Sequence, residues 1–304
     1  MYDIVVVGGG PAGMTAALYG LRNQKTVLVL EKNGFGGQIA YSPKVENFPG
    51  ALQISGSALA DSMMEQILAQ GAEVELEKAI SVEDCGTYKT VKTEEGGSYD
   101  CKAVILATGV RHRLLGLPGE EEMIGSGISF CAVCDGDFYR NQTVCVAGGG
   151  NSALQEAILL ADKCKEVIML QDLPEFTGEK RLQELLFRRE NVRTRTNVHI
   201  DSLILENGQL KGLETTDKIT GEKVTEHCDG LFVAVGLIPE NTAFAPLARL
   251  DDFGYFAADE SGVTQTPGVF VAGDCRSKRF RQVTTACADG TQAALGACRY
   301  IDGM

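Results

Sequence analysis

The sequence of 304 residues has no apolar run of the ~18 residues that a membrane-spanning helix needs. It also has no basic segment before its first apolar run, so we expect no secretory signal. Basic residues are in the minority: 28 lysines and arginines stand against 41 aspartates and glutamates, a formal net charge of −13. A surface of this charge repels the phosphates of nucleic acid. These absences exclude membrane proteins and nucleic-acid-binding proteins, and they predict a cytoplasmic protein.

Glycine, by contrast, is abundant, with 36 residues, and its clusters follow an order that occurs twice. In each copy an apolar run leads into a glycine turn, then a helix of small and apolar residues, and then a second apolar run. The first copy runs from Tyr2 to Glu31 and the second from Thr143 to Gln171. Each copy is followed by weakly alternating sequence typical of an antiparallel meander, residues 74–91 and 198–224, and then by a strand that ends in glycine.

Such a duplication predicts an α/β fold of two Rossmann-like (three-layer ββα) dinucleotide-binding domains. The ~60 residues after the second copy are too few for a third domain. We expect them to complete the first domain, so that the second domain is inserted into the first. The predicted boundaries place residues 1–112 and 242–304 in the first domain and residues 113–241 in the inserted one.

The first glycine turn has the full context of a dinucleotide-binding site. Gly8 suits the tight turn, Gly10 the close approach of a pyrophosphate, and Gly13 the contact of the helix with the strand. The following helix offers free N–H groups to the phosphates, and Glu31, after the next strand, suits a ribose diol. A purely structural glycine turn is the less favoured alternative. This turn is therefore predicted to bind a dinucleotide.

The second turn keeps its glycines, Gly148 and Gly150, but no positive charge follows its second strand. Residues 172–178 contain neither lysine nor arginine, and the 2′-phosphate of NADP needs such a partner. Gln171 or Asp172 would suit the 2′-hydroxyl of NAD, while an empty site fits the residues at least as well. The sequence therefore gives NAD(P)H no clear site.

Two of the ten cysteines, Cys131 and Cys134, are separated by two residues, a spacing that lets their thiols form a small disulfide ring. Asp135 follows directly and is placed to give or take a proton as thiol and thiolate interchange. A zinc site is the alternative, but the sequence holds no second CxxC or CxxH to complete it. The single cysteines lie mostly in apolar runs and are predicted to be buried. We therefore expect a redox-active pair and no metal.

Five ordered motifs resemble those of the low-molecular-weight thioredoxin reductases, and the resemblance covers the whole chain. They are residues 8–13, 36–38 with 45–50, 107–109, 131–139 and 266–274, followed by Arg281-Gln282 and a closing helix. The resemblance implies an FAD enzyme that forms a homodimer. It also implies that the enzyme reduces the disulfide of thioredoxin or of a thioredoxin-like protein.

The same resemblance assigns roles to individual residues. Cys134 would lie against the flavin, Cys131 would attack the substrate disulfide, and Asp135 would act as the acid. Glu31 would bind the ribose of the adenosine, and Asp274 the ribitol. The complete set of FAD-binding residues that it implies is Gly8, Gly10, Pro11, Ala12, Gly13, Glu31, Lys32, Gly36, Gly37, Gln38, Asn47, Ala107, Thr108, Gly109, Gly273, Asp274, Arg281, Gln282 and Val283.

One departure from the family concerns the electron donor. Members that use NADPH carry a His-Arg-Arg run and a further arginine where this sequence has Gln171, Asp172, Leu173 and Thr177. That pattern resembles the subgroup that takes electrons from ferredoxin, so reduced ferredoxin or flavodoxin is the expected donor. A ferredoxin near about −400 mV reduces a thioredoxin near about −270 mV with a gain of ~6 kcal/mol for two electrons.

Ferredoxins are usually acidic, so docking on this acidic chain needs a local basic patch. The candidates are Arg276, Lys278, Arg279 and Arg281, which lie within six residues of one another. A solvated loop with Arg281 on the cofactor is an equally favoured interpretation.

Three other functions stay open at this point. The first is the same reaction with NADPH or NADH as donor. The second is a dithiol oxidase that passes electrons to oxygen, which needs the same motifs. The third is a flavin-bound redox sensor without turnover, against which Asp135 argues because a sensor needs no acid.

Overall fold

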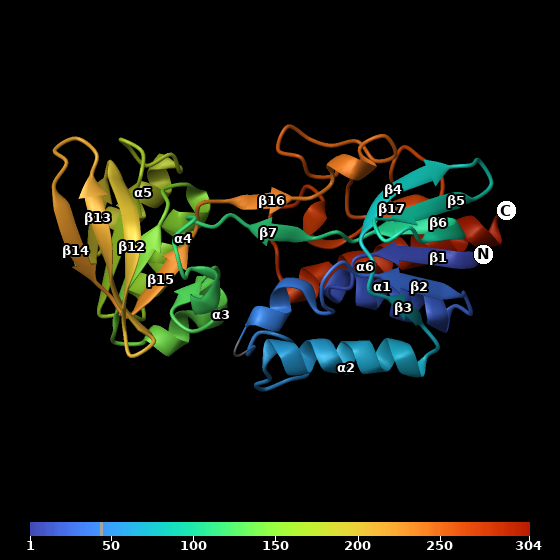
Figure 1. Cartoon of the computed structure of the whole chain (residues 1–304), viewed down its shortest axis with the longest axis horizontal. Helices are drawn as coiled ribbons and strands as arrows, with labels where there is room; N and C mark the ends of the chain where they lie inside the picture. Colours follow the sequence, from blue (N-terminus) through green and yellow to red (C-terminus); the bar gives the residue numbers. More distant parts are fainter. Residues whose placement is uncertain (43–44) are drawn as a thin grey trace. The chain divides into compact units, whose positions relative to one another are not determined.

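The computed structural model describes residues 1–42 and 45–304 and divides the chain into two compact units. Unit 1 comprises Met1–Arg111 and Ile238–Met304, and unit 2 comprises His112–Leu237. Figure 1 shows the elements of both units. The connecting strands β7 (Val110–His112) and β16 (Leu237–Pro239) pair with each other. Within the described ranges, no helix is long and apolar enough to cross a membrane.

Unit 1 is built on a seven-stranded sheet with the order β3-β2-β1-β6-β5-β4, in which β17 also pairs with β6. Its parallel strands are β1 (Tyr2–Val7), β2 (Val27–Leu30), β3 (Glu73–Glu75), β6 (Ser98–Leu106) and β17 (Val269–Val271). The strands β4 (Ala79–Asp84) and β5 (Lys89–Thr93) form an antiparallel meander with β6. The helices are α1 (Pro11–Arg22), α2 (Gly56–Ala69) and α6 (Val283–Asp302), with short 3-10 turns η1 (Gly37–Tyr41), η4 (Thr242–Phe244) and η5 (Gly273–Cys275).

The buried stretches of the central strands, residues 4–7 of β1 and 103–106 of β6, are apolar at every position, as expected where both faces of a sheet are covered. Ile4 and Val6 of β1 point into a cluster with α1 and α6. Val5 and Val7 point to the other face and pack with Phe244 and neighbouring residues. The continuous apolar run at the start of the sequence therefore forms the middle of a three-layer unit.

Unit 2 repeats this plan. Its parallel sheet has the order β11-β10-β9-β15-β8, and a separate antiparallel sheet has the order β12-β13-β14. The parallel strands are β8 (Ile128–Ser129), β9 (Thr143–Ala147), β10 (Glu166–Gln171), β11 (Val192–Thr196) and β15 (Gly230–Val233). The antiparallel strands are β12 (Val198–Glu206), β13 (Gln209–Asp217) and β14 (Lys223–His227). The helices are α3 (Ala132–Asp135), α4 (Asn151–Ala161) and α5 (Lys180–Phe187), with 3-10 turns η2 (Glu121–Met123) and η3 (Gly136–Tyr139).

The predicted fold class of two Rossmann-like three-layer units is confirmed, with one correction and one shift. The first predicted meander, residues 74–91, was wrong at its start: β3 pairs in parallel with β2, and the meander begins at β4. The helices α1 and α4 start within the glycine turns, at Pro11 and Asn151, rather than after them. Proline is favoured at the first helical position because its missing N–H would have no partner there.

Candidate functional site

The glycine turn of unit 1 is closed around backbone atoms. A Cβ at Gly8, where φ is +112°, would lie 2.2 Å from the Ala107 carbonyl oxygen, and one at Gly13 would lie 1.8 Å from the Gly8 oxygen. At Gly10 the nearest atom would be 4.0 Å away, so the backbone there stays open to a group approaching from outside. Gly10 caps α1 without a side chain, which leaves the first helical N–H groups available. The turn thus has the cradle that a pyrophosphate needs.

Glu31 is almost fully buried at the end of β2, and the turn orients its carboxylate. Its Oε2 accepts from the Gly9 N–H at 2.7 Å and its Oε1 from the Asn33 N–H at 3.0 Å. Each oxygen keeps a further lone pair for a hydroxyl. The Gly36 N–H donates to the Gly9 carbonyl at 2.9 Å, and this bond holds the segment of Gly36, Gly37 and the exposed Gln38 beside the turn. The neighbouring Lys32 is paired with Glu240.

Asp274 supplies an acceptor that lacks a donor within the unit. Its Oδ1 is buried and has no hydrogen-bond partner in the part of the chain that the structure describes. Burial raises the pKa of Asp274, although the ammonium of Lys278, 3.9 Å away, acts in the opposite direction. A buried carboxylate oxygen without a partner is costly unless a donor arrives. Asp274 therefore fits a ligand hydroxyl, as the ribitol chain of FAD would provide.

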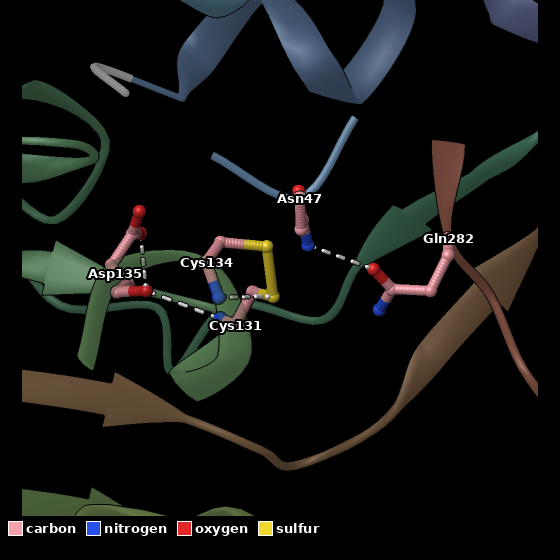
Figure 2. Close-up of a disulfide and its surroundings, with 6 residues drawn as sticks. Asn47, Cys131, Cys134, Asp135 and Gln282 are labelled. Atoms are coloured by element: carbon pink, nitrogen blue, oxygen red, sulfur yellow. Dashed lines mark hydrogen bonds between the residues drawn. A yellow bond between two sulfur atoms is a disulfide. The ribbon is translucent and has the colours of Figure 1, made fainter. Parts of the chain in front are cut away.

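The other predicted cofactor residues of unit 1 lie on neighbouring elements. Figure 2 shows the Asn47 amide donating to the Gln282 side-chain oxygen, at 3.2 Å. Gln282 caps α6, and Val283 is its first helical residue. Arg281 lies over the ring of Tyr255. Thr108, between Ala107 and Gly109, donates to the side chain of Asn241 at 2.7 Å.

Asn241 is a residue that the sequence did not single out. It is fully buried, and its amide donates to the carbonyls of Gly254 and Cys275 at 2.9 and 2.8 Å. With the bond from Thr108 it ties three loops together near Asp274. In the sequence it stood out only as the last residue of the predicted inserted domain, residues 113–241.

The proposed basic docking patch is wrong for two of its four members. Arg276 and Lys278 are buried, and both bind Asp289 of α6: Arg276 through two bonds of 2.8 Å and Lys278 at 2.9 Å. Burial alone would raise the pKa of Asp289, but the hydrogen bonds from these cations lower it. An acid in the middle of a helix of small residues was the signal that sequence reasoning missed. Arg279 is the one exposed member of the four.

The cysteine pair of unit 2 is a disulfide, as predicted from its spacing. Cys131 caps the short helix α3, and its Cα lies 5.3 Å from that of Cys134 (Figure 2). The Cys134 N–H donates to the Cys131 sulfur at 3.2 Å. A hydrogen bond to sulfur stabilises the thiolate form, so the local backbone favours negative charge on Cys131 once the disulfide is reduced.

Asp135 lies at the end of the same helix. Burial raises the pKa of its carboxyl, and a hydrogen bond from the Ser129 hydroxyl, 2.7 Å from Oδ2, partly offsets this. Its Oδ1 is buried and has no partner among the described residues. A carboxyl with a raised pKa next to a cysteine pair is suited to proton transfer. Ser129, a polar residue between Ile128 and Phe130, is a second residue that the sequence analysis missed.

Among the described residues no three His, Cys, Asp or Glu side chains gather into a group that could hold a metal ion. His112 stacks on Phe130 with ring centroids 4.3 Å apart, and burial lowers its pKa to about 4. This histidine is a packing residue. His199 pairs with Asp172 on the surface of unit 2.

The second glycine turn copies the backbone of the first but not its polar partners. The N–H groups of Thr177 and Gly178 donate to the Gly149 carbonyl at 2.9 and 3.0 Å. Gln171 is buried under the turn and donates to the Glu175 carbonyl at 3.1 Å. Asp172 points the other way and binds Lys218 at 2.9 Å, which lowers the pKa of its carboxyl. Both residues expected to read a ribose hydroxyl therefore already have partners within the chain.

Comparison with known proteins gives a consistent result along the whole length. The model of the pyridine nucleotide-disulphide oxidoreductase family matches residues 2–290. A thioredoxin reductase of Peptoclostridium acidaminophilum is 39% identical over 310 residues, which cover 99% of this chain and 98% of that protein. One of Listeria monocytogenes is 38% identical and covers 100% of this chain and 95% of its own. The crystal structure of thioredoxin reductase from Streptococcus pyogenes is 36% identical with a TM-score of 0.93, covering 100% of this chain and 99% of that one.

Proposed function

Because the chain belongs to the pyridine nucleotide-disulphide oxidoreductase family, as a flavoprotein disulfide oxidoreductase of the low-molecular-weight thioredoxin reductase type, we propose a specific electron path for it. Reduced ferredoxin or flavodoxin is the donor, and Cys131 and Cys134 pass the electrons to the disulfide of thioredoxin. Unit 1 would hold FAD, which would supply the redox group between the donor and the two cysteines. The observation that carries the proposal is the disulfide between Cys131 and Cys134, beside a carboxyl whose pKa is raised.

The residues of unit 1 fit FAD at both ends of the cofactor. The open backbone at Gly10 and the free N–H groups of α1 would hold the pyrophosphate, and Glu31 would accept from the ribose. Asp274 would accept from the ribitol through its unpartnered Oδ1. FAD, when bound, supplies a group that takes up single electrons and releases them as a pair.

The two sulfurs take different roles. The hydrogen bond from the Cys134 N–H favours the thiolate on Cys131, so Cys131 is the sulfur that attacks thioredoxin. Cys134 then attacks Cys131 to release reduced thioredoxin and restore the disulfide. Asp135 holds the proton that the departing thiolate of thioredoxin needs.

The residues of unit 2 support a donor other than NADPH. No arginine or lysine occurs in residues 172–178, and the sequence has Asp172, which is bound to Lys218, at a position where NADPH-using members carry an arginine. Each charge-assisted hydrogen bond of that kind contributes ~1.5–3 kcal/mol. The loss of several of them removes the affinity for NADPH that the reaction would require.

The donor is tested by mixing the FAD-loaded protein anaerobically with NADPH, NADH and reduced ferredoxin in turn. Flavin bleaching and the appearance of thioredoxin thiols are followed together. We expect rapid bleaching and thiol formation with ferredoxin and slow bleaching with both nicotinamides. Rapid bleaching by NADPH or NADH would overturn the donor assignment. Reduction of oxygen to hydrogen peroxide as a small dithiol is oxidised would favour a dithiol oxidase. No turnover with any donor would favour a sensor.

A gain-of-function variant sharpens the donor test. Leu173→Arg combined with Thr177→Arg restores two guanidinium groups on the loop after β10, where Leu173 is exposed. We expect the rate of flavin reduction by NADPH at low concentration to rise about tenfold or more. Leu185→Arg, which adds a cation on the exposed face of α5, is the matched control and leaves that rate unchanged. An equal rise of the rate in the double variant and in Leu185→Arg would show that net charge alone causes the effect.

A further inference from the structure

Ser129 is hydrogen-bonded both to Cys131 and to Asp135, the first and last residues of the segment that carries the cysteine pair. It is the last residue of β8, is only 4% exposed, and is fixed by the pairing of β8 with β15. Its hydroxyl donates to Asp135 Oδ2 at 2.7 Å, and its oxygen accepts the Cys131 N–H at 3.1 Å. Figure 2 draws both bonds as dashed lines, from the Asp135 carboxyl and from the Cys131 backbone nitrogen.

We propose that Ser129 is a positioning residue for disulfide exchange, which orients Asp135 so that Oδ1 is the oxygen that carries the exchanged proton. The inference rests on the proposed function of the cysteine pair and assigns a role to a residue outside it.

The number of hydrogens on each group determines which atom donates and which accepts in the two bonds of Ser129. A serine hydroxyl has one hydrogen, and the Cys131 N–H can only donate, so the serine oxygen is the acceptor of that bond. The hydroxyl hydrogen is then free for Asp135, whose Oδ2 accepts it. Oδ1 has no partner among the described residues and is buried, so a proton on the carboxyl resides there.

The charged and titratable groups around Asp135 leave Ser129 as its polar partner. On η3, burial raises the pKa of Tyr139 to about 12, with the charge of Asp135 as a further cause, so this phenol stays neutral. Asp137 is paired with Lys163 and Arg140. On α4, which packs against α3, burial raises the pKa of Glu156 to about 8, so this carboxyl is neutral at lower pH. Burial raises the pKa of Asp135, and the hydrogen bond from Ser129 acts in the opposite direction.

The exchange step balances with Asp135 as the proton carrier. The reduced enzyme starts with the Cys131 thiolate, the Cys134 thiol and the Asp135 acid. Cys131 attacks one thioredoxin sulfur, the thioredoxin S–S bond breaks, and the leaving thiolate takes the proton from Asp135. Asp135 then receives the proton of Cys134, and the Cys134 thiolate attacks Cys131 and breaks the mixed disulfide. The second thioredoxin thiolate takes that proton, so the enzyme ends as a disulfide and thioredoxin as a dithiol.

The test compares Ser129→Ala with the wild type in two measurements on the FAD-loaded protein. The first is single-turnover reduction of thioredoxin by the pre-reduced enzyme, from about pH 5 to about pH 9. The second is infrared titration of the Asp135 carboxyl, identified by its absence in Asp135→Asn. Without the bond from Ser129 the charged carboxylate is less stable, so we expect the apparent pKa of Asp135 to rise by about one pH unit, a tenfold change in proton affinity. The pH limb of the exchange rate that Asp135 governs moves upward with it.

Two further variants separate this role from packing. Ser129→Thr keeps the hydroxyl and is expected to keep the wild-type pKa of Asp135. Ser126→Ala removes a hydroxyl of the same segment that donates to the Met123 carbonyl, and it is expected to change neither measurement. An Asp135 pKa that is the same in Ser129→Ala and in the wild type would overturn the proposal. So would a rate that falls equally at every pH. If the reduced wild type does not reduce thioredoxin at all, the proposed function fails, while the infrared titration still decides the role of Ser129.

Discussion

Two cysteines of one short segment differ in chemistry because a single backbone group distinguishes them. The Cys134 N–H donates to the Cys131 sulfur at 3.2 Å. Ser129 donates to Asp135, the last residue of the same helix, and accepts from the N–H of Cys131, which caps its start. If the disulfide is reduced as proposed, the segment would combine a stabilised thiolate with a carboxyl that can carry a proton, which is what repeated thiol–disulfide exchange requires.

The asymmetry of the two sulfurs predicts different outcomes for their serine variants. Cys131→Ser removes the attacking sulfur, so thioredoxin reduction falls about 1,000-fold or more. Cys134→Ser keeps the attack but blocks release, so a mixed disulfide between Cys131 and thioredoxin accumulates and is seen by mass spectrometry. Cys85→Ser, at an exposed free cysteine, is the control and keeps wild-type activity. Mixed disulfide in Cys131→Ser but not in Cys134→Ser would reverse the assigned roles.

Individual elements are positioned by contacts too close for any side chain. Gly13 of α1 touches the Gly8 carbonyl, and Gly290 of α6 touches the Ala12 carbonyl, where a Cβ would lie 2.2 Å away. Asp289, one residue before Gly290, binds Arg276 and Lys278 and also accepts from the Gly273 N–H at 3.1 Å. The loop that carries Asp274 is therefore fixed to α6, and α6 is fixed to the start of α1.

The close contact at Gly13 predicts weaker binding of the cofactor when a methyl group is added. In Gly13→Ala the Cβ meets a backbone oxygen that cannot move away, and overpacking of this kind costs ~1–3 kcal/mol. We expect FAD affinity of the apoprotein to fall about tenfold, measured by quenching of flavin fluorescence. Gly34→Ala is the matched control because no atom lies within 4 Å of its added Cβ. Unchanged affinity in Gly13→Ala would place the cofactor away from this turn.

On the scale of the whole molecule, the chain forms two units of the same architecture, and its C-terminal residues complete the first unit. Residues 238–304 return to the unit formed by residues 1–111, where β17 joins β6 and α6 covers the face beside α1. The homodimer, the predicted domain boundaries and the site residues inferred from the family stay predictions. The stability of the folded chain depends on pH through one buried group, Glu156.

Burial raises the pKa of Glu156 from 4.5 to about 8, and one of its oxygens is buried with no partner in the described chain. Between these pH values the unfolded chain has released a proton that the folded chain still holds. The free energy of unfolding therefore falls as pH rises from about 4.5 to about 8 and levels off above. Glu156→Gln replaces the protonated acid with a neutral amide of the same shape and removes this decline.

We expect Glu156→Gln to be more stable than the wild type at pH 8 by about 2–5 kcal/mol, and the difference to shrink toward acid pH. Urea unfolding at a series of pH values measures it. Glu184→Gln, at an exposed glutamate of α5, is the control and shows the wild-type pH dependence. Parallel curves for Glu156→Gln and the wild type would show that Glu156 is charged in the folded protein.

The sequence alone determined whatever depends on local order along the chain. Three local features predicted the duplicated α/β fold and the disulfide: the apolar runs, the glycine turns and the spacing of Cys131 and Cys134. They could do so because backbone conformation and strand burial depend mainly on neighbouring residues. Only the tertiary structure decided the partners of polar side chains. It placed Arg276 and Lys278 on Asp289, Ser129 on Asp135 and Asn241 among three loops. Such pairs join different elements of the fold, and a buried polar group has its partner only after folding has brought the two elements together.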